Sequence, residues 1–262
     1  MRRIPLPFAA VAILLSVCGP ALAQTEVTLI APGGIRSPIE KLIPGFEKKT
    51  GYKVNPTFGS GGGTKKQVIS GDVFDVPIVQ PPLAEVTASG NVVESTATPL
   101  AAVAVGVAVK KGAPKPDISS AEAVKKMLLS AKSIVCPDGA TGAAAGVSIN
   151  DMLKKLGIDD QVEPKLKRVR GTGAGGAGGG TMVSGMVANG EAEIGMTFVS
   201  EMTDPGIDIV GVLPKEVSPW TPLVGYISTH SKNPEAAKAL LKYLSSPDAV
   251  AAYKAAGMQP GK

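Results

Sequence analysis

The sequence predicts an α/β fold in which mostly parallel sheets are flanked by helices. Two observations predict it. From Val27 onward, short β-branched runs alternate with helical patterns, which is the order that strand–helix–strand units produce. The run AVAVGVAV at residues 102–109 is apolar throughout, as expected for a strand that is covered on both faces.

The first predicted strand covers residues 26–30, and the first predicted helix follows it at once. Ser37 is placed as the N-cap of this helix, Pro38 at its first position, and Glu40 completes a capping box. Pro44 is expected to kink or restart the helix. The buried face of the helix is expected to carry Ile39, Leu42, Ile43 and Phe46.

The remaining elements follow the same order along the chain. Strands are predicted at 52–58, 73–79, 102–109, 133–136, 192–199, 207–213 and 223–229. Helices are predicted at 64–70, 82–90, 119–130, 144–157 and 182–190, the third with a capping box at Ser119 and Glu122. Two C-terminal helices are expected to begin after the caps Asn233 and Ser246, each of which precedes a proline.

Four glycine-rich loops lead into predicted helices. They are PGGIR at 32–36, GSGGGTKK at 59–66, DGATGAA at 138–144 and GTGAGGAGGG at 171–180. Glycines let a ligand approach the backbone, and the N–H groups and dipole of a helix start favour anions. A single loop of this kind is more often only a tight turn. Four of them, with donors on Arg36, Ser60, Thr64 and Thr141, predict a site for a small anion.

The ends and the composition limit the function classes. Arg2-Arg3, a short apolar run and ALA at 21–23 predict a signal peptide over residues 1–23 and a periplasmic mature chain from Gln24. Its removal lowers the formal charge from +5 to +3, because only two arginines are lost. We find no transmembrane segment and no basic run typical of nucleic-acid binding, and we expect a monomer. With one histidine, His230, and one cysteine after cleavage, Cys136, we expect no zinc site. His230 precedes a predicted helix in a loop and is expected at the surface, which disfavours a Ser-His-Asp triad, and we expect no cofactor.

Three stretches carry a family resemblance. VTLIAPGGI at 27–35, IPGFEKKTGYKV at 43–54 and FGSGGGTKKQVISGDVFDVPIV at 58–79 resemble periplasmic solute-binding proteins of ABC importers, specifically the molybdate-binding type. The resemblance implies the two-lobed type II periplasmic binding protein fold, which closes on its ligand by a hinge. It implies one lobe from residues 24–105 plus 214–262 and a second from 106–213. It also implies a non-catalytic receptor that delivers a small anion to an ABC permease.

The resemblance and the glycine loops together give a ligand site. Its expected residues are Gly33, Gly34, Arg36, Ser60, Gly61, Thr141, Gly142, Ala143, Gly178, Gly179 and Phe198. The molybdate pattern has a serine at the position of Gly34 and a tyrosine near that of Phe198. Loss of those two hydroxyls leaves a tetrahedral oxyanion short of donors, whereas Arg36 suits a carboxylate. The sequence therefore favours a small carboxylate over molybdate.

A second resemblance keeps an enzyme open as the alternative. GAPKPDIS at 112–119 and PGIDIVGVLP at 205–214 are similar to stretches of periplasmic aconitate isomerases, which share this scaffold. Their chemistry removes and returns a proton on an allylic carboxylate and needs a base near the cleft. Glu201 is the candidate base, with Lys65 and Asp138 as others. If the protein is a receptor, Glu201 only begins or caps a helix.

Overall fold

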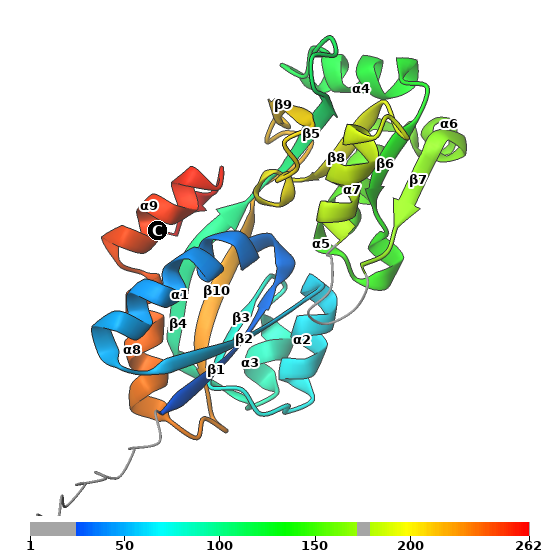
Figure 1. Ribbon diagram of the computed structural model, residues 1–262. Coiled ribbons are helices and arrows are strands. Elements are labelled where there is room, and N and C mark those ends of the chain that lie inside the picture. The colour runs from blue at the N-terminus through cyan, green and yellow to red at the C-terminus, as the bar shows by residue number, and fades with distance from the viewer. Residues whose placement is uncertain (1–24, 172–178, 262) are drawn as a thin grey trace, which may run out of the picture.

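Two sheets, each with its own helices, form two lobes in the computed structural model, which describes residues 25–171 and 179–261 (Figure 1). The predicted α/β, two-lobed architecture is confirmed. The chain crosses from the first sheet to the second at Ala104, between Val103 and Val105. It returns in the segment between Val212 and Thr221, so two strand connections join the lobes.

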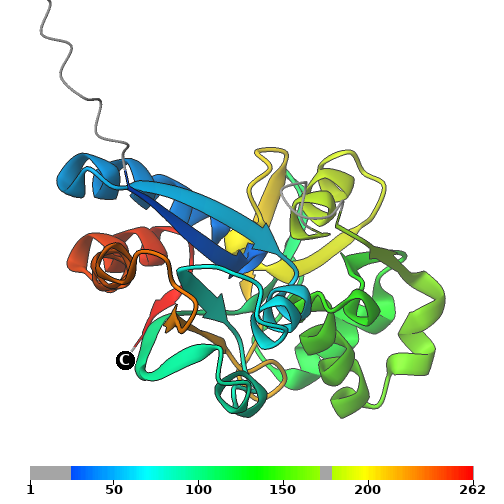
Figure 2. The same ribbon diagram turned by 90° about the horizontal axis from the view of Figure 1, so that it is seen from below.

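The first sheet has six strands in the order β11-β4-β10-β3-β1-β2. Their bounds are β1 Glu26–Pro32, β2 Lys53–Gly59, β3 Val76–Val79, β4 Val92–Val103, β10 Thr221–Ser228 and β11 Gln259–Pro260. Helices cover both faces: α1 (Arg36–Thr50), α8 (Pro234–Leu244) and α9 (Pro247–Ala255) group on one side, and α2 (Gly61–Ile69) and α3 (Ala84–Ala88) on the other (Figure 2). Leu29 and Ile30 of β1 accordingly pack into different clusters, because successive strand residues face opposite ways.

The second sheet has five strands in the order β7-β6-β8-β5-β9. Their bounds are β5 Val105–Lys110, β6 Ile134–Pro137, β7 Leu166–Val169, β8 Ile194–Phe198 and β9 Ile207–Val212. The flanking helices are α4 Ala121–Ser130, α5 Ala144–Leu156, α6 Asp159–Val162 and α7 Gly179–Ala188. Short 3-10 turns lie at η1 Gly33–Ile35, η2 Gly139–Thr141, η3 Glu163–Lys165 and η4 Val199–Glu201.

The sheets are mixed, which corrects the expectation of mostly parallel sheets. In the first sheet β1 is parallel to β2 and β3, but β10 is antiparallel to β3 and β4. In the second, β6 is parallel to β7 and β8, but β5 is antiparallel to β8 and β9. The antiparallel pairs involve β4, β5, β9 and β10, which adjoin the crossings between the lobes, and the C-terminal β11, which pairs with β4. Three strands of each sheet therefore remain parallel, and their carboxyl ends meet at one edge.

Two predicted N-caps, Ser37 and Ser119, are wrong. The first helix begins at Arg36 and not after Ser37, because η1 runs directly into it and leaves Ile35 as a cap without a side-chain hydrogen bond. Pro44 lies inside this helix without ending it. In α4 the cap is Ser120 and not Ser119: the Ser120 hydroxyl accepts from the N–H of Ala123.

The remaining predicted caps precede helices α2, α8 and α9. Helix α2 begins at Gly61, three residues before the predicted start, and Ser60 caps it by accepting from the N–H of Gly63. Ser246 caps α9 as predicted. Asn233 precedes α8 but makes no cap bond, because its side-chain amide donates to the carbonyl of Glu26.

Candidate functional site

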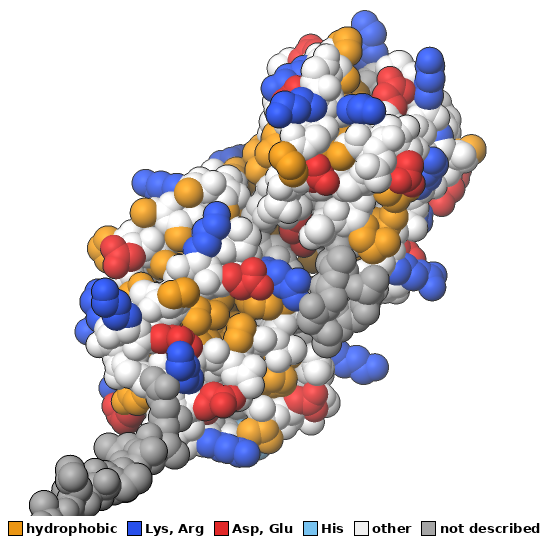
Figure 3. Space-filling view, viewed as in Figure 1, with side chains coloured by type: hydrophobic (Ala, Val, Ile, Leu, Met, Phe, Trp, Pro, Cys, Tyr) orange, Lys and Arg blue, Asp and Glu red, His pale blue; other side chains and the backbone are white. Residues whose placement is uncertain are grey.

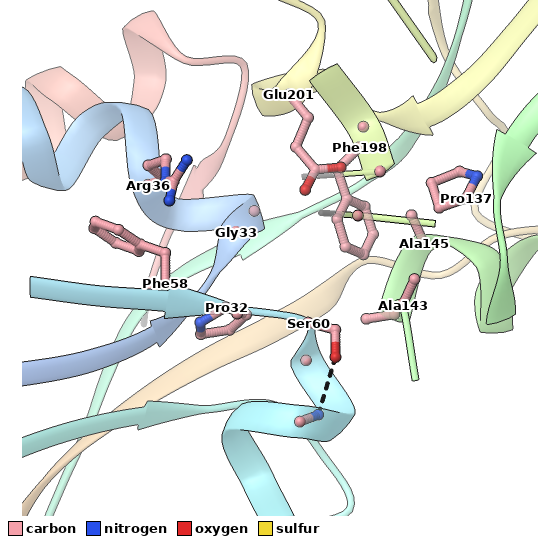
Figure 4. Close-up of a pocket in the computed structure, with 18 of the residues that line it drawn as sticks. Pro32, Gly33, Arg36, Phe58, Ser60, Pro137, Ala143, Ala145, Phe198 and Glu201 are labelled. Atoms are coloured by element: carbon pink, nitrogen blue, oxygen red, sulfur yellow. Dashed lines mark hydrogen bonds between the residues drawn. The ribbon is translucent and has the colours of Figure 1, made fainter. Parts of the chain in front are cut away.

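A cavity of about 410 Å³ lies between the lobes, and both contribute to its wall (Figure 4). This volume is in the range of sites for small molecules. The surface is hollowed between the lobes on the face shown in Figure 3. The cavity wall contains residues at or just after the carboxyl ends of the parallel strands, namely Gly33, Ser60 and Gln80 in the first lobe and Arg170 and Phe198 in the second. Ligands of open α/β sheets bind at this edge.

Most of the predicted site residues meet in this cavity. Its wall includes Gly33, Gly34, Arg36, Ser60, Gly61, Thr141, Ala143, Gly179, Phe198 and also Glu201. Gly142 is not in the wall but contacts the first lobe beside it. Gly178 lies outside the described residues, as does most of the fourth glycine loop. The structure thus brings parts of all four loops to one place, and their role toward a ligand remains a prediction.

Two hydrogen bonds to backbone carbonyls join the lobes beside the cavity. The N–H of Gly62, in α2, donates to the carbonyl of Gly142 at 2.9 Å. The buried hydroxyl of Ser200, in η4, donates to the carbonyl of Gly34 at 2.7 Å. A Cβ atom at Gly62 would lie 3.1 Å from the Cα of Gly142, so the glycines permit this close approach.

Only some of the predicted main-chain donors are available to a ligand. In α2 the N–H groups of Gly62, Gly63 and Thr64 bond to Gly142 and Ser60. The N–H of Gly61 has no partner among the described residues. In α5 the first two N–H groups, of Ala144 and Ala145, likewise have none within the described chain, and both residues line the cavity. The helix starts therefore offer donors from both lobes, but fewer than the glycine count suggested.

Glu201 is the one carboxylate among the described residues that line the cavity. Its Oε2 accepts from the hydroxyl of Thr197 at 2.6 Å, which fixes the side chain. Burial raises the pKa of Glu201 above its ordinary value, and the hydrogen bonds from Thr197 and from the backbone of Phe198 oppose this rise only in part. A carboxylate with a raised pKa in a cleft is suited to accept and return a proton.

The first lobe leaves room for this carboxylate. A Cβ atom at Gly33 would lie 3.3 Å from Oε1 of Glu201, so the side chain from the second lobe reaches the backbone of the first. At the neighbouring Gly34, a Cβ atom would lie 3.2 Å from Cδ2 of Phe198. The ring of Phe198 therefore occupies the space that a serine side chain at Gly34 would need.

Arg36, the first residue of α1, lines the cavity from the first lobe (Figure 4). Its guanidinium carbon is 5.0 Å from the centre of the Phe58 ring, a cation–π contact, and its Nε is 3.8 Å from Oε1 of Glu40. The side chain keeps 28% of its surface exposed. It can therefore place a positive charge at the cavity wall while the ring supports its position.

The two other candidate bases are engaged outside this role. Asp138 accepts from Arg170 at 3.0 Å, and this bond, with one from the N–H of Ala140, lowers the pKa of Asp138. It is therefore held ionised. The ammonium of Lys65 donates to the carbonyl of Pro82 at 3.1 Å. Neither Asp138 nor Lys65 belongs to the cavity wall.

Sequence reasoning missed several residues of the wall. Gln80 follows β3 directly, and Arg170 follows β7. Pro32 and Pro137 end strands β1 and β6 at the same edge. The signal that marks Gln80 is a polar residue at the end of a fully buried strand, VPIV. It carries no glycine pattern, so a search for glycine loops passes over it.

Comparisons with known proteins agree with this geometry. The model of the bacterial extracellular solute-binding protein family matches residues 27–259. The chain belongs to this family. Among the residues that the structure describes, none of the helices is long and apolar enough to cross a membrane.

Two curated relatives cover nearly the whole chain. An aconitate isomerase from a Pseudomonas species is 34% identical over 97% of this chain and 97% of its own length. The molybdate-binding protein of Azotobacter vinelandii is 30% identical over 93% and 92%. The solved structure of an Azotobacter vinelandii periplasmic molybdate-binding protein superposes with a TM-score of 0.71 at 18% identity, over 88% of this chain and 98% of its own. The solved structure supports the fold alone.

Proposed function

We propose that this protein binds a small unsaturated tricarboxylate between its lobes and isomerises it, with Glu201 as the base. The observation that carries the proposal is the carboxylate of Glu201, which faces the cavity and has a raised pKa. The relative at 34% identity, an aconitate isomerase, supplies the substrate class. The position of Glu201 in the cavity wall supports an isomerase over a receptor without turnover.

The chemistry is a proton shift across three carbons. Glu201 removes a proton from the methylene carbon beside one carboxylate, and the electron pair of that C–H bond forms a new double bond as the original one opens. The same carboxyl group then returns the proton to the carbon at the far end of the allylic unit. Atoms and charge balance without an oxidant, a reductant or a metal.

The remaining groups of the wall suit the charge that develops. Negative charge spreads from the deprotonated carbon onto the adjacent carboxylate, where a positive or N–H donor stabilises it. Arg36 offers a guanidinium from the first lobe, and Ala144 and Ala145 offer N–H groups from the second. Thr197 holds Oε2 of Glu201, so that Oε1 is the oxygen that receives the proton.

The test is turnover of cis-aconitate by the mature chain, followed by NMR in deuterated water. We expect trans-aconitate to form and to retain protium at the reprotonated carbon, because the same carboxyl group carries the proton between the two carbons. Glu201→Gln should lower the rate by at least about 100-fold, the contribution typical of a general base. Glu122→Gln, an exposed glutamate of the same lobe, is the control and should keep full rate. No turnover by the wild type, or unchanged turnover in Glu201→Gln, overturns the proposal.

A receptor for an ABC importer is the second candidate. The observation that favours it is the family match together with helix-start donors from both lobes. Calorimetry against molybdate, tungstate, sulfate and a set of di- and tricarboxylates separates the two candidates. Tight binding of any of these without turnover of cis-aconitate supports the receptor. Because Gly34 and Phe198 supply no hydroxyl, we expect carboxylates to bind more tightly than molybdate.

Both candidates act outside the cytoplasm under this proposal. The chain is exported to the periplasm and loses residues 1–23, as the basic start and the ALA motif indicate. N-terminal sequencing of the protein from a periplasmic extract should start at Gln24. A mature protein that retains Met1 contradicts the export proposal.

A further inference from the structure

Gln80 buries an unpaired amide in the cavity wall. The residue follows β3, lines the cavity and keeps 3% of its surface exposed. Neither Nε2 nor Oε1 of this side chain has a hydrogen-bond partner among the described residues. A buried polar group without a partner destabilises a fold, so such a group calls for a reason. A ligand oxygen in the cavity is a partner that fits.

The start of helix α2 adds a second donor at the same place. Gly61 lines the cavity, and its N–H is the one member of the first four in this helix without a partner in the described chain. A Cβ atom at Gly61 would collide with Oε1 of Gln80 and lie 3.0 Å from the Cβ of Ala144. The glycine therefore lets the amide of Gln80 lie directly against the helix start.

We propose that Gln80 and the N–H of Gly61 form a subsite that binds one carboxylate of the ligand. Nε2 of Gln80 and the backbone N–H donate to its oxygens. Arg36, which follows β1 and not β3, holds another carboxylate, so the pair makes the site select for ligands with several carboxylates. This inference rests on the proposed function for the class of ligand, but it concerns binding and not the proton transfer.

The experiment uses tricarballylate, a saturated tricarboxylate that cannot be isomerised, and succinate as its dicarboxylate counterpart. Calorimetry measures both dissociation constants for the wild type, Gln80→Met and Gln80→Glu. Loss of one hydrogen bond to a charged oxygen should raise the constant for tricarballylate about tenfold in Gln80→Met. Gln80→Glu should raise it further through repulsion. Gln161→Glu, an exposed residue in α6, is the charge-matched control and should bind like the wild type.

Thermal unfolding without ligand distinguishes a binding role from a structural one. Methionine has a similar shape to glutamine and leaves no orphan polar atom, so Gln80→Met should melt at the same temperature as the wild type or higher. A lower melting temperature together with unchanged affinity would show that Gln80 serves the fold and overturns the subsite.

The outcomes separate this inference from the proposed function. In one outcome the protein turns over cis-aconitate, while neither Gln80→Met nor Gln80→Glu changes the KM or the affinity for tricarballylate. That result overturns the subsite and leaves the isomerase. Tricarballylate binding that depends on Gln80, without turnover, supports the subsite and overturns the isomerase. A wild type that binds no tricarballylate overturns the subsite as proposed.

Discussion

Alanine at Gly62 is expected to weaken ligand binding without weakening the fold. Gly62 is the second residue of helix α2, and its N–H bonds to the carbonyl of Gly142 in the other lobe. Its φ angle is not in the left-handed region, so alanine fits the local backbone. Because alanine favours helix over glycine, the isolated lobe should gain up to about 1 kcal/mol.

Ligand affinity should fall all the same, because the added Cβ of alanine disturbs the contact between the lobes. The new Cβ would lie 3.1 Å from Cα and 3.2 Å from the oxygen of Gly142, which is inside the ordinary contact distance between such atoms. The lobes must separate by a few tenths of an ångström, and the hydrogen bond from the N–H of Gly62 to the carbonyl of Gly142 lengthens. Losing it costs about 0.5–1.5 kcal/mol, which corresponds to a rise in Kd of about twofold to twelvefold.

Calorimetry with tricarballylate measures this rise, and thermal unfolding without ligand measures the stability. The control is Gly185→Ala, in helix α7, where a Cβ would meet nothing within 4 Å. It carries the same chemical change and should leave Kd unchanged. A Gly62→Ala protein that binds as tightly as the wild type would refute the idea that this contact forms when the lobes enclose the ligand.

Two further predictions follow from charged residues. Arg36→Ala should raise Kd for tricarballylate about tenfold, because a charge-assisted contact is lost. The exposed Lys41→Ala is the control and should leave Kd unchanged. An Arg36→Ala protein that binds tricarballylate as tightly as the wild type would show that Arg36 does not belong to the site. Asp75→Asn should lower the free energy of unfolding, measured in urea, by about 2–4 kcal/mol. The buried carboxylate of Asp75 accepts five hydrogen bonds, which connect β1 to the loop before α8. The control is the exposed Asp72→Asn, which should change the free energy of unfolding by under about 0.5 kcal/mol. Burial alone would raise the pKa of Asp75, but hydrogen bonds from Thr28 and the other donors outweigh it, and the pKa is lowered. The stabilisation by Asp75 should therefore be complete above about pH 4 and fade as the pH falls through the folded-state pKa. A difference in unfolding free energy between wild type and Asp75→Asn that grows in acid contradicts this prediction.

Local signals in the sequence explain the elements that were predicted well. The apolar run 133–136 lies in the buried strand β6, because β-branched residues pack on a covered sheet face. The run 102–109 is predicted as one strand, but it is divided at Ala104 between β4 and β5, which belong to different sheets. Ser246 before Pro247 marked the start of α9. These features depend on residues within a few positions of each other, so the sequence order alone displays them.

Helix caps show where local signals mislead. Ser37 followed by Pro38 has the pattern of a helix start. The 3-10 turn η1 (Gly33–Ile35) runs directly into α1, however, so the helix begins at Arg36, one residue before Ser37. Ser119 and Ser120 are both suitable caps, and the pattern chose the wrong one. In each case the neighbouring backbone decided between candidates whose intrinsic preferences are nearly equal.

By itself, the sequence determined the alternation of strands and helices, the glycine loops and the two lobes that the family resemblance implied. Only the tertiary structure decided which strands are antiparallel, how Gly34 and Phe198 share one space, and that Glu201 from one lobe reaches Gly33 of the other. It also revealed Gln80, whose buried amide has no hydrogen-bond partner among the residues that the structure describes. The reason is physical: burial, desolvation and hydrogen-bond partners depend on segments more than a hundred residues apart, and those segments meet only when the two sheets have formed.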